Sequence, residues 1–139
     1  MSNLNAFLKP VEVEKKKDVV ISKRFKDPDS GDYAKWTIRT ITQDVNASLR
    51  KKHTKKEFKK GQWVESFDTQ GYQRDIVLAC VVVPDFRDVK LCEAWGTQDP
   101  AVVAERMLYP GEYLALIDTI MDLCGFTDED NSADEQAKN

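Results

Sequence analysis

Apolar and polar residues alternate along the chain between residues 19 and 41, with a polar break in the middle. The alternating apolar positions are Val19, Ile21, Phe25, Ala34, Trp36 and Ile38. This period of two, rich in β-branched and aromatic residues, is typical of half-buried β-strands. Residues 26–32 are dense in turn-forming residues. The pattern predicts a β-hairpin over residues 19–41, which must pack on other elements to be stable.

The period then changes to that of an amphipathic helix. Val45 and Leu49 are four residues apart, as on one helical face, and Gly61 is placed to end the helix. We therefore predict a helix over residues 43–60. Its apolar stripe is thin, because Phe58 is the one large apolar residue in its second half.

The middle of the chain gives two different signals. Residues 61–72 carry Trp63 and Phe67 among turn-forming residues, and this pattern predicts a loop. Residues 75–83 are continuously apolar after Asp75, so periodicity alone leaves helix and strand both open.

The last third predicts three more helices, over residues 88–95, 99–108 and 110–124. Asp99 followed by Pro100 provides an N-cap with proline at the first helical position. Pro110 opens the final helix in the same way, and Gly125 fits its C-terminal cap.

Together these elements predict an α+β fold that is mainly helical. An N-terminal β-hairpin packs on a bundle of four to five helices, at about residues 43–60, 73–83, 88–95, 99–108 and 110–124. Residues 1–18 are expected to form a flexible arm, residues 19–126 a single globular domain, and residues 127–139 a disordered acidic tail.

Charge is polarised along the chain. The 139 residues carry 21 Lys and Arg and 24 Asp and Glu, a net charge of −3. Residues 1–60 hold 16 basic and 8 acidic side chains, whereas residues 61–139 hold 5 basic and 16 acidic ones. A half of +8 and a half of −11 permit head-to-tail association between copies, and neutralisation within one fold is an equal alternative.

Composition and motifs argue against several classes of function. No apolar run approaches the roughly 20 residues of a membrane helix, and the N-terminus lacks a signal-peptide pattern, which favours the cytoplasm. His53 is the single histidine, the six glycines never cluster, and the three cysteines lack metal-ligand spacing. We therefore expect no enzymatic activity, no cofactor and no metal.

The sharpest local feature is a cluster of seven cations in eleven residues, from Arg50 to Lys60. On the predicted helix, six lysines of this cluster share one face. Three interpretations remain open: a solvated helix face, docking on an acidic protein surface, or binding of nucleic acid. The acidic pI near 5.2 disfavours nucleic acid as the partner.

An ordered set of motifs resembles a known family. It includes Asn5–Pro10, Trp36–Arg39, Leu91–Gly96, Asp99-Pro100, Leu108–Tyr113 (Leu-Tyr-Pro-Gly-Glu-Tyr) and Gly125-Phe126. This set is similar to the XkdN-like family of phage tail assembly chaperones, found in contractile-tailed phages and in prophages of the PBSX and skin-element type. The family pattern favours a helix for residues 75–83.

The resemblance implies a non-enzymatic role in the cytoplasm of a bacterial host. Such chaperones bind the long, helical tape measure protein, help to recruit tail tube subunits around it, and are absent from the mature virion. Some have a longer frameshifted product, which suits an acidic tail. A weak homo-oligomer would suit a coating protein.

The expected partner-binding surface combines the basic cluster with two aromatic residues that follow it. Its members are Arg50, Lys51, Lys52, Lys55, Lys56, Lys59, Lys60, Trp63 and Phe67. The alternative function is that of a small accessory nucleic-acid-binding protein using the same basic helix.

Overall fold

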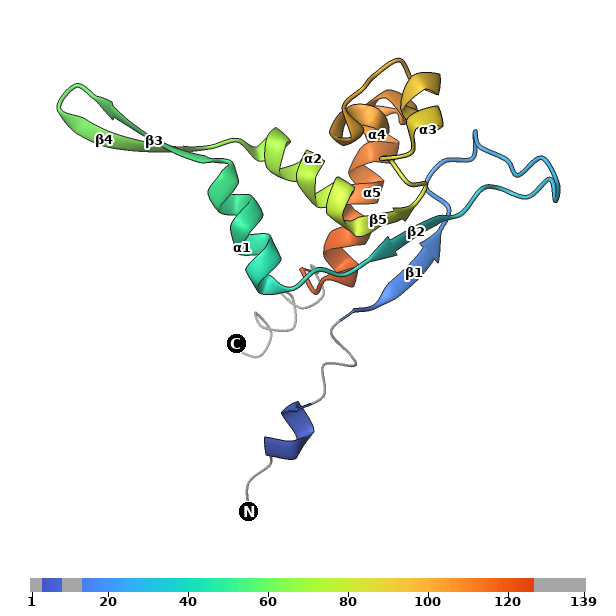
Figure 1. Ribbon diagram of the computed structural model, residues 1–139, viewed down its shortest axis with the longest axis horizontal. Coiled ribbons are helices and arrows are strands. Elements are labelled where there is room, and N and C mark those ends of the chain that lie inside the picture. The colour runs from blue at the N-terminus through green and yellow to red at the C-terminus, as the bar shows by residue number, and fades with distance from the viewer. Residues whose placement is uncertain (1–3, 9–13, 127–139) are drawn as a thin grey trace, which may run out of the picture.

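The structure is a computed structural model that describes residues 4–8 and 14–126. Its elements in chain order are a 3₁₀ helix η1 (Leu4–Phe7), β1 (Lys16–Val19), β2 (Trp36–Arg39), α1 (Gln43–Lys52), β3 (Thr54–Lys59), β4 (Gln62–Phe67), α2 (Thr69–Cys80), β5 (Val81–Val83), α3 (Val89–Ala94), a 3₁₀ helix η2 (Pro100–Val102), α4 (Val103–Met107) and α5 (Pro110–Leu123). The mixed α+β class predicted from the sequence is confirmed (Figure 1). The predicted tail, residues 127–139, lies outside the described residues.

A three-stranded antiparallel sheet, in the order β1-β2-β5, forms one side of the core. The central strand β2 buries Trp36 and Ile38, the alternating positions that the sequence predicts, and leaves Arg39 exposed. Lys16 pairs with Arg39 and Val19 with Trp36. The sheet thus uses the expected second strand of the hairpin as its centre.

The first strand of the hairpin starts earlier than predicted, at Lys16, within the segment expected to be an arm. The residues between Val19 and Trp36 form a long connection that contains a single β-bridge, between Lys26 and Tyr33. Phe25 packs edge-on against Trp95, with ring centroids 6.0 Å apart. Beyond Val19, the alternating apolar residues up to Phe25 therefore mark contacts with the core, not a strand.

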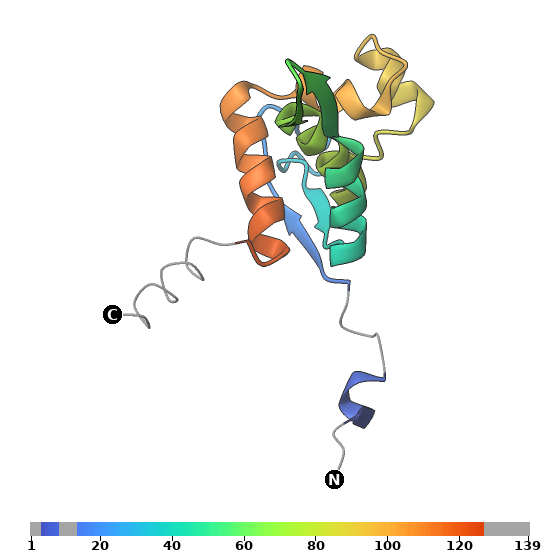
Figure 2. The same ribbon diagram turned by 90° about the vertical axis from the view of Figure 1, so that its left-hand side faces the viewer.

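Helices α2 and α5 supply most of the remaining core. Ile76, Val77 and Cys80 of α2 are buried with Leu116 and Ile120 of α5. In the view of Figure 2, α1 and α5 lie on opposite sides of the sheet strands. The final helix, predicted over residues 110–124, is confirmed as α5.

The other predicted helices are confirmed with shifted bounds. The helix expected at 88–95 is α3, and the one at 99–108 divides into η2 and α4. Asp99 caps η2, since its carboxylate accepts a hydrogen bond from the amide of Ala101 at 3.0 Å. The helix expected over residues 73–83 is wrong at both ends, because α2 begins at Thr69 and ends at Cys80.

After α2, the three valines of β5 pair with β2. Residues 75–83 therefore contain both of the structures that periodicity left open. The run of β-branched side chains favours a strand at its end, and Asp68 caps the helix earlier than expected by accepting a hydrogen bond from the amide of Gly71 at 3.0 Å.

The largest correction concerns the predicted helix over residues 43–60. Helix α1 ends at Lys52, and the chain then forms a second antiparallel hairpin, β3–β4, where part of a helix and a loop were expected. Lys60 and Gly61 both have positive φ, at 52° and 77°, as in a two-residue type I′ turn. A helix beyond Lys52 would have only Phe58 to bury, so the chain gains nothing from continuing it.

Candidate partner-binding surface

The β3–β4 hairpin projects from the ends of α1 and α2 (Figure 1). Every residue of β4 is exposed, and so is every residue of β3 except Thr54. A two-stranded hairpin is marginally stable by itself. Its position must therefore be fixed by contacts where the hairpin meets the helices, a region that we call the base.

At one side of the base, an aromatic cluster closes the hairpin. The Arg50 guanidinium lies over the rings of Phe67 and Tyr72, at 4.8 and 5.7 Å from their centroids. Phe67 and Tyr72 also contact each other, with centroids 5.4 Å apart. The hydroxyl of Tyr72 donates a hydrogen bond to the Asn46 side chain. Burial raises the pKa of Tyr72, and Arg50 offsets part of this shift.

At the other side of the base, polar side chains join α1 to α2. Both Lys52 Nζ, at 2.9 Å, and His53 Nε2, at 2.7 Å, contact Oδ2 of Asp75. Burial acts to raise the pKa of Asp75, but the hydrogen bonds from Lys52 and His53 outweigh it and lower this pKa. The amide of Asp68 donates to the carbonyl of His53 at 2.8 Å and closes the two ends of the hairpin.

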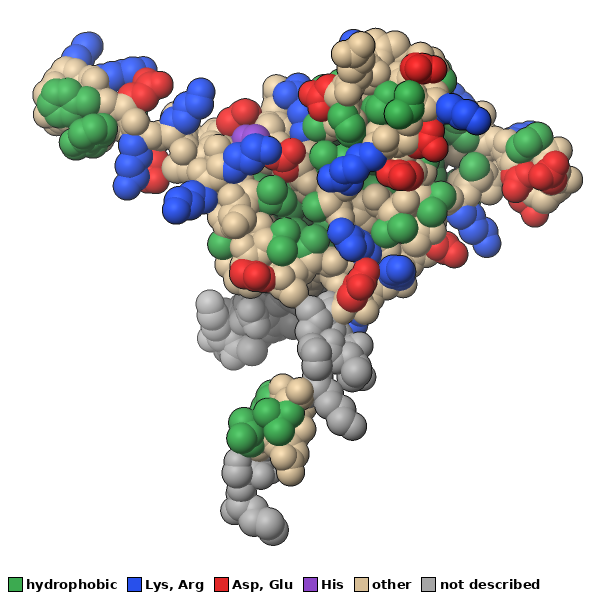
Figure 3. Space-filling view, in the orientation of Figure 1, with side chains coloured by type: hydrophobic (Ala, Val, Ile, Leu, Met, Phe, Trp, Pro, Cys, Tyr) green, Lys and Arg blue, Asp and Glu red, His purple; other side chains and the backbone are tan. Residues whose placement is uncertain are grey.

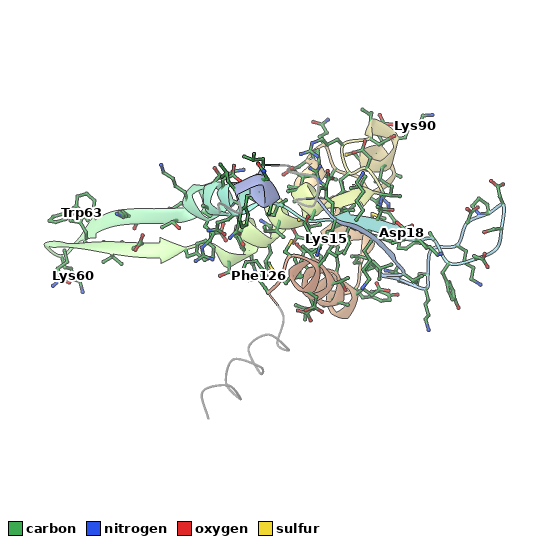
Figure 4. The ribbon with its side chains drawn as sticks, turned by 90° about the horizontal axis from the view of Figure 1, so that it is seen from below. Lys15, Asp18, Lys60, Trp63, Lys90 and Phe126 are labelled. Atoms are coloured by element: carbon green, nitrogen blue, oxygen red, sulfur yellow. The ribbon has the colours of Figure 1, made fainter. Side chains whose placement is uncertain are left out.

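The free end of the hairpin, which we call the tip, carries Phe58 to Trp63. Phe58 and Trp63 are directly opposite on the two strands, and their rings meet edge-on with centroids 5.4 Å apart. Their side chains are 61% and 72% exposed. Figure 3 shows hydrophobic side chains at this end of the hairpin, and Figure 4 places Lys60 and Trp63 there. Large apolar side chains this exposed indicate a contact surface.

The middle of the hairpin, together with Lys51 at the end of α1, forms a third region that we call the shaft. An open hollow of about 570 Å³ is lined by Lys51, Thr54, Lys56 and Glu65. A second hollow of about 480 Å³ shares Lys56 and Glu65 and continues to Trp63 and Val64. The two hollows share two lining residues, so they lie next to each other between the end of α1 and the tip.

The predicted common face of six lysines does not exist. Side chains alternate between the faces of a strand pair, so Lys56 lies on the face of Phe58 and Trp63, whereas Lys55 and Lys59 lie on the opposite face. The expected residues divide into three groups. Arg50, Lys52 and Phe67 form the base, Lys51, Lys55 and Lys56 lie on the shaft, and Lys59, Lys60 and Trp63 lie at the tip.

Sequence reasoning missed two residues of this surface, Phe58 and His53. Phe58 was assigned to the weak stripe of a helix. The signal that could have placed it is the Lys60-Gly61 pair between two short stretches with aromatic residues, which is a hairpin signal. His53 is absent from the predicted surface, because its contact with Asp75 depends on how α1 packs on α2, which its neighbours in the sequence do not indicate.

The described residues offer neither a metal site nor a membrane-spanning helix. Among residues 4–8 and 14–126, no group of three or more His, Cys, Asp or Glu side chains could hold a metal ion. No helix in the part of the chain that the structure describes is long and apolar enough to cross a membrane. The described side chains at the hairpin instead form an open, mixed aromatic and basic surface.

The fold and this surface are those of a small α+β protein that presents a projecting hairpin. The chain belongs to the phage XkdN-like tail assembly chaperone family, because the family model matches residues 4–138. This confirms the resemblance carried by the sequence motifs.

Two individual relatives cover most of the chain. The chain is 35% identical over 133 residues to the phage-like element PBSX protein XkdN of Bacillus subtilis (strain 168), covering 94% of this chain and 88% of the relative. It is 34% identical over 124 residues to the uncharacterized protein YqbN of the same strain, covering 88% and 83%. A crystal structure of YqbN matches with a TM-score of 0.71 and 30% identity, over 88% of this chain and 96% of that one.

Proposed function

We propose that this tail assembly chaperone binds the tape measure protein and helps to recruit tail tube subunits around it. The role is non-enzymatic, it takes place in the cytoplasm of the bacterial host, and the protein is absent from the mature virion. One observation carries the proposal: a chaperone of this family holds an exposed aromatic and basic hairpin away from its core, where it can reach a long partner (Figure 3).

The shaft suits a helical segment of the tape measure protein. Its two hollows run along the hairpin and offer Lys51 and Lys56 as cations, with the Trp63 ring as an apolar contact. A helix with an acidic and an apolar stripe would satisfy both kinds of group. Because these lysines are exposed, each ion pair would be weak, which allows a chaperone to release its partner during assembly.

All nine residues of the expected partner-binding surface have a role in this proposal. Arg50, Lys52 and Phe67 orient the hairpin at its base, while the remaining predicted residues on the shaft and at the tip make contacts with partners. Self-association of the chaperone into a weak homo-oligomer, with head-to-tail contacts permitted by the charge polarity, belongs to the same proposal.

Co-purification tests the tape measure contact. The chaperone and the tape measure protein encoded by the same phage or prophage are expressed together, and one of them carries an affinity tag. Changing Lys51, Lys55 and Lys56 together to Glu should reduce recovery of the tape measure protein at least tenfold, because it places anions where the shaft offers cations.

A matched control makes the same charge change elsewhere. Lys23, Lys26 and Lys35 lie exposed on the connection between β1 and β2, and their change to Glu should leave recovery unaltered. Equal recovery with both triple variants would exclude the shaft as the contact. Absence of binding by the wild-type protein would refute the proposed function itself.

Two further measurements test the remaining steps. Adding the tail tube protein to the purified complex should give a ternary complex that the tape measure protein alone does not form. Mass spectrometry of purified phage particles should detect the tube and tape measure proteins without the chaperone. Detection of the chaperone in stoichiometric amount would contradict the assembly role.

A further inference from the structure

We propose that the tip of one copy docks on an acidic stripe of helix α5 in a second copy. The stripe consists of Gly111, Leu114, Ala115, Asp118 and Asp122, the exposed residues of α5 after Pro110. This inference rests on the self-association proposed above and names its two surfaces. It does not depend on the tape measure protein, whose proposed contact is tested through the shaft lysines.

The tip presents an apolar group next to a cationic one. Phe58 and Trp63 form the exposed aromatic pair, and Lys59 and Lys60 follow Phe58 directly. Residues 54–67 of the hairpin contain four lysines and two glutamates, so the hairpin carries a net positive charge. One lysine at the tip, Lys59, contacts Glu57 at 3.0 Å, and both side chains are well exposed, so this pair can exchange partners.

The stripe presents the complementary pair of groups. Leu114 is 58% exposed, and the small residues Gly111 and Ala115 beside it allow a close approach. Beside Leu114, an open hollow of about 300 Å³ between α2, α4 and α5 is also lined by Pro110, Tyr113, Gln70, Gln73 and Glu105. An aromatic side chain can enter this hollow, and the carboxylate or amide oxygens could accept the indole N–H of Trp63.

Charge complementarity identifies the second copy as the partner. Helix α5 contains three acidic residues and no Lys or Arg. Among the described residues, neither Asp118 nor Asp122 takes part in an ion pair. Arg24 already contacts Glu112 of α5, and Arg74 contacts Glu105 beside the hollow, so the acidic groups left for the tip are Asp118 and Asp122. The cationic tip and these two carboxylates attract each other between copies.

The distance between the apolar group and the charged group is similar on the two surfaces. Leu114 and Asp118 are one turn apart on α5, about 6 Å along the helix axis. Phe58 and Lys60 are two residues apart, and Lys60 lies in the turn, so their backbones are at most about 7 Å apart. When the aromatic pair covers Leu114, the ammonium of Lys60 can therefore reach the carboxylate of Asp118.

The contact must form between copies. The base holds the hairpin so that it projects away from α5 of its own chain (Figure 1). Tip and stripe are different surfaces, so the contact is heterologous, and repeating it gives a ring or an open chain of copies. Two aromatic side chains bury about 300–500 Å², below the roughly 800 Å² per partner of a standard stable interface, so the association is weak.

Analytical ultracentrifugation of three forms of the isolated protein tests the docking. The tip variant combines Phe58→Ala with Trp63→Ala, and the stripe variant combines Leu114→Ala with Asp118→Lys. These side chains are all exposed, so both variants should fold, which circular dichroism verifies. The wild-type mass should rise with concentration and fall on raising NaCl to about 0.5 M, while each variant should associate at least tenfold more weakly.

Mixing the two variants gives the decisive result. The intact tip of the stripe variant can dock on the intact stripe of the tip variant, but no further contact is possible. An equimolar mixture should therefore form a heterodimer and no larger species.

A mixture that stays monomeric would overturn the proposal, and so would a stripe variant that associates like the wild type. A wild-type protein that remains monomeric at high concentration would overturn it as well. The co-purification with the tape measure protein is scored separately, so its failure and the failure of this docking remain distinguishable.

Discussion

His53 and Asp75 join the end of helix α1 to the middle of helix α2, with 2.7 Å between Nε2 of His53 and Oδ2 of Asp75. Both side chains are largely buried, at 15% and 13% exposure. The hairpin begins at the residue after His53, so this contact sets the direction in which the hairpin leaves the core. A polar pair in the base thereby controls where the exposed aromatic tip is held.

Changing His53 to Ala should loosen the hairpin and leave most of the core intact. The variant leaves the partly buried carboxylate of Asp75 with Lys52 alone, and such a loss costs about 1–3 kcal/mol. Thermal unfolding should show the lower stability, and hydrogen exchange should be faster in residues 54–67 than in α5. Lys59→Ala is the control, because it removes only the exposed pair with Glu57. Equal exchange in the two variants would argue against this role for His53.

Gly71 should not tolerate a side chain. A Cβ atom at this position would lie 2.5 Å from the Asp68 carboxylate and 2.6 Å from the His53 ring, closer than atoms can approach. Gly71→Ala should therefore lower the melting temperature and disturb the base. Gly111→Ala is the matched control in α5, where a Cβ meets no atom within 4 Å, and the helix should gain up to about 1 kcal/mol. A neutral Gly71→Ala would show that the base can shift without cost.

These contacts explain which parts of the fold could be predicted from the sequence. Helix α5 and strand β2 carry their own signals, since capping residues bound the helix and alternating Trp36 and Ile38 mark the strand. Strand β5 follows directly on α2, so one continuous run of apolar side chains does not show where the helix ends and the strand begins. That boundary depends on the pairing of β5 with β2, which is distant in the sequence.

The hairpin and its base were harder to predict, for a physical reason. Residues 54–67 bury almost nothing, so no burial pattern marks them, and lysines occur on helices as readily as on exposed strands. The base consists of two sets of contacts. Arg50 meets Phe67 and Tyr72, and His53 meets Asp75, only after the chain has folded back through the hairpin. The residue types of the surface could be predicted, but its geometry could not.

Glu112 should make the free energy of unfolding depend on pH in the acidic range. Its Oε1 contacts Arg24 Nη2 at 2.7 Å and accepts a hydrogen bond from the Tyr109 amide at 2.8 Å. Hydrogen bonds from Arg24, Ser22 and the Tyr109 amide lower the pKa of Glu112 to about 2. Because the folded state lowers this pKa, the stabilisation is present above the usual glutamate pKa and is lost as the pH falls toward 2.

Melting temperatures between pH 7 and pH 2 test this dependence. Glu112→Gln should melt lower than the wild type at pH 7, because it loses the charge that Arg24 contacts. Between about pH 4.5 and pH 2, its melting temperature should decline less steeply than that of the wild type. Parallel curves for the two proteins would assign the acid sensitivity to other carboxylates.

The distribution of lysines on the hairpin predicts weak and nonspecific contact with nucleic acid. On the helix expected from the sequence, six lysines would face one phosphate backbone together. In the structure, Lys55 and Lys59 lie on one face of the hairpin. Lys56 lies on the other face, directly opposite Glu65 of β4 in the strand register. Of the three lysines in β3, at most two share a face, and Glu57 lies between them.

The number of lysines on one face predicts how steeply the affinity for DNA falls with salt, because each phosphate contact releases counterions. Each phosphate contact contributes about 0.9 to the slope of the logarithm of affinity against the logarithm of salt concentration. A face with two lysines should therefore give a slope of about 2 in gel shifts with duplex DNA, and no binding above background at physiological salt. Lys55→Glu with Lys59→Glu should abolish the residual low-salt binding, whereas Lys23→Glu with Lys26→Glu should not. A slope of 5 or more would mean that lysines from both faces bind together, and it would restore nucleic acid as a partner.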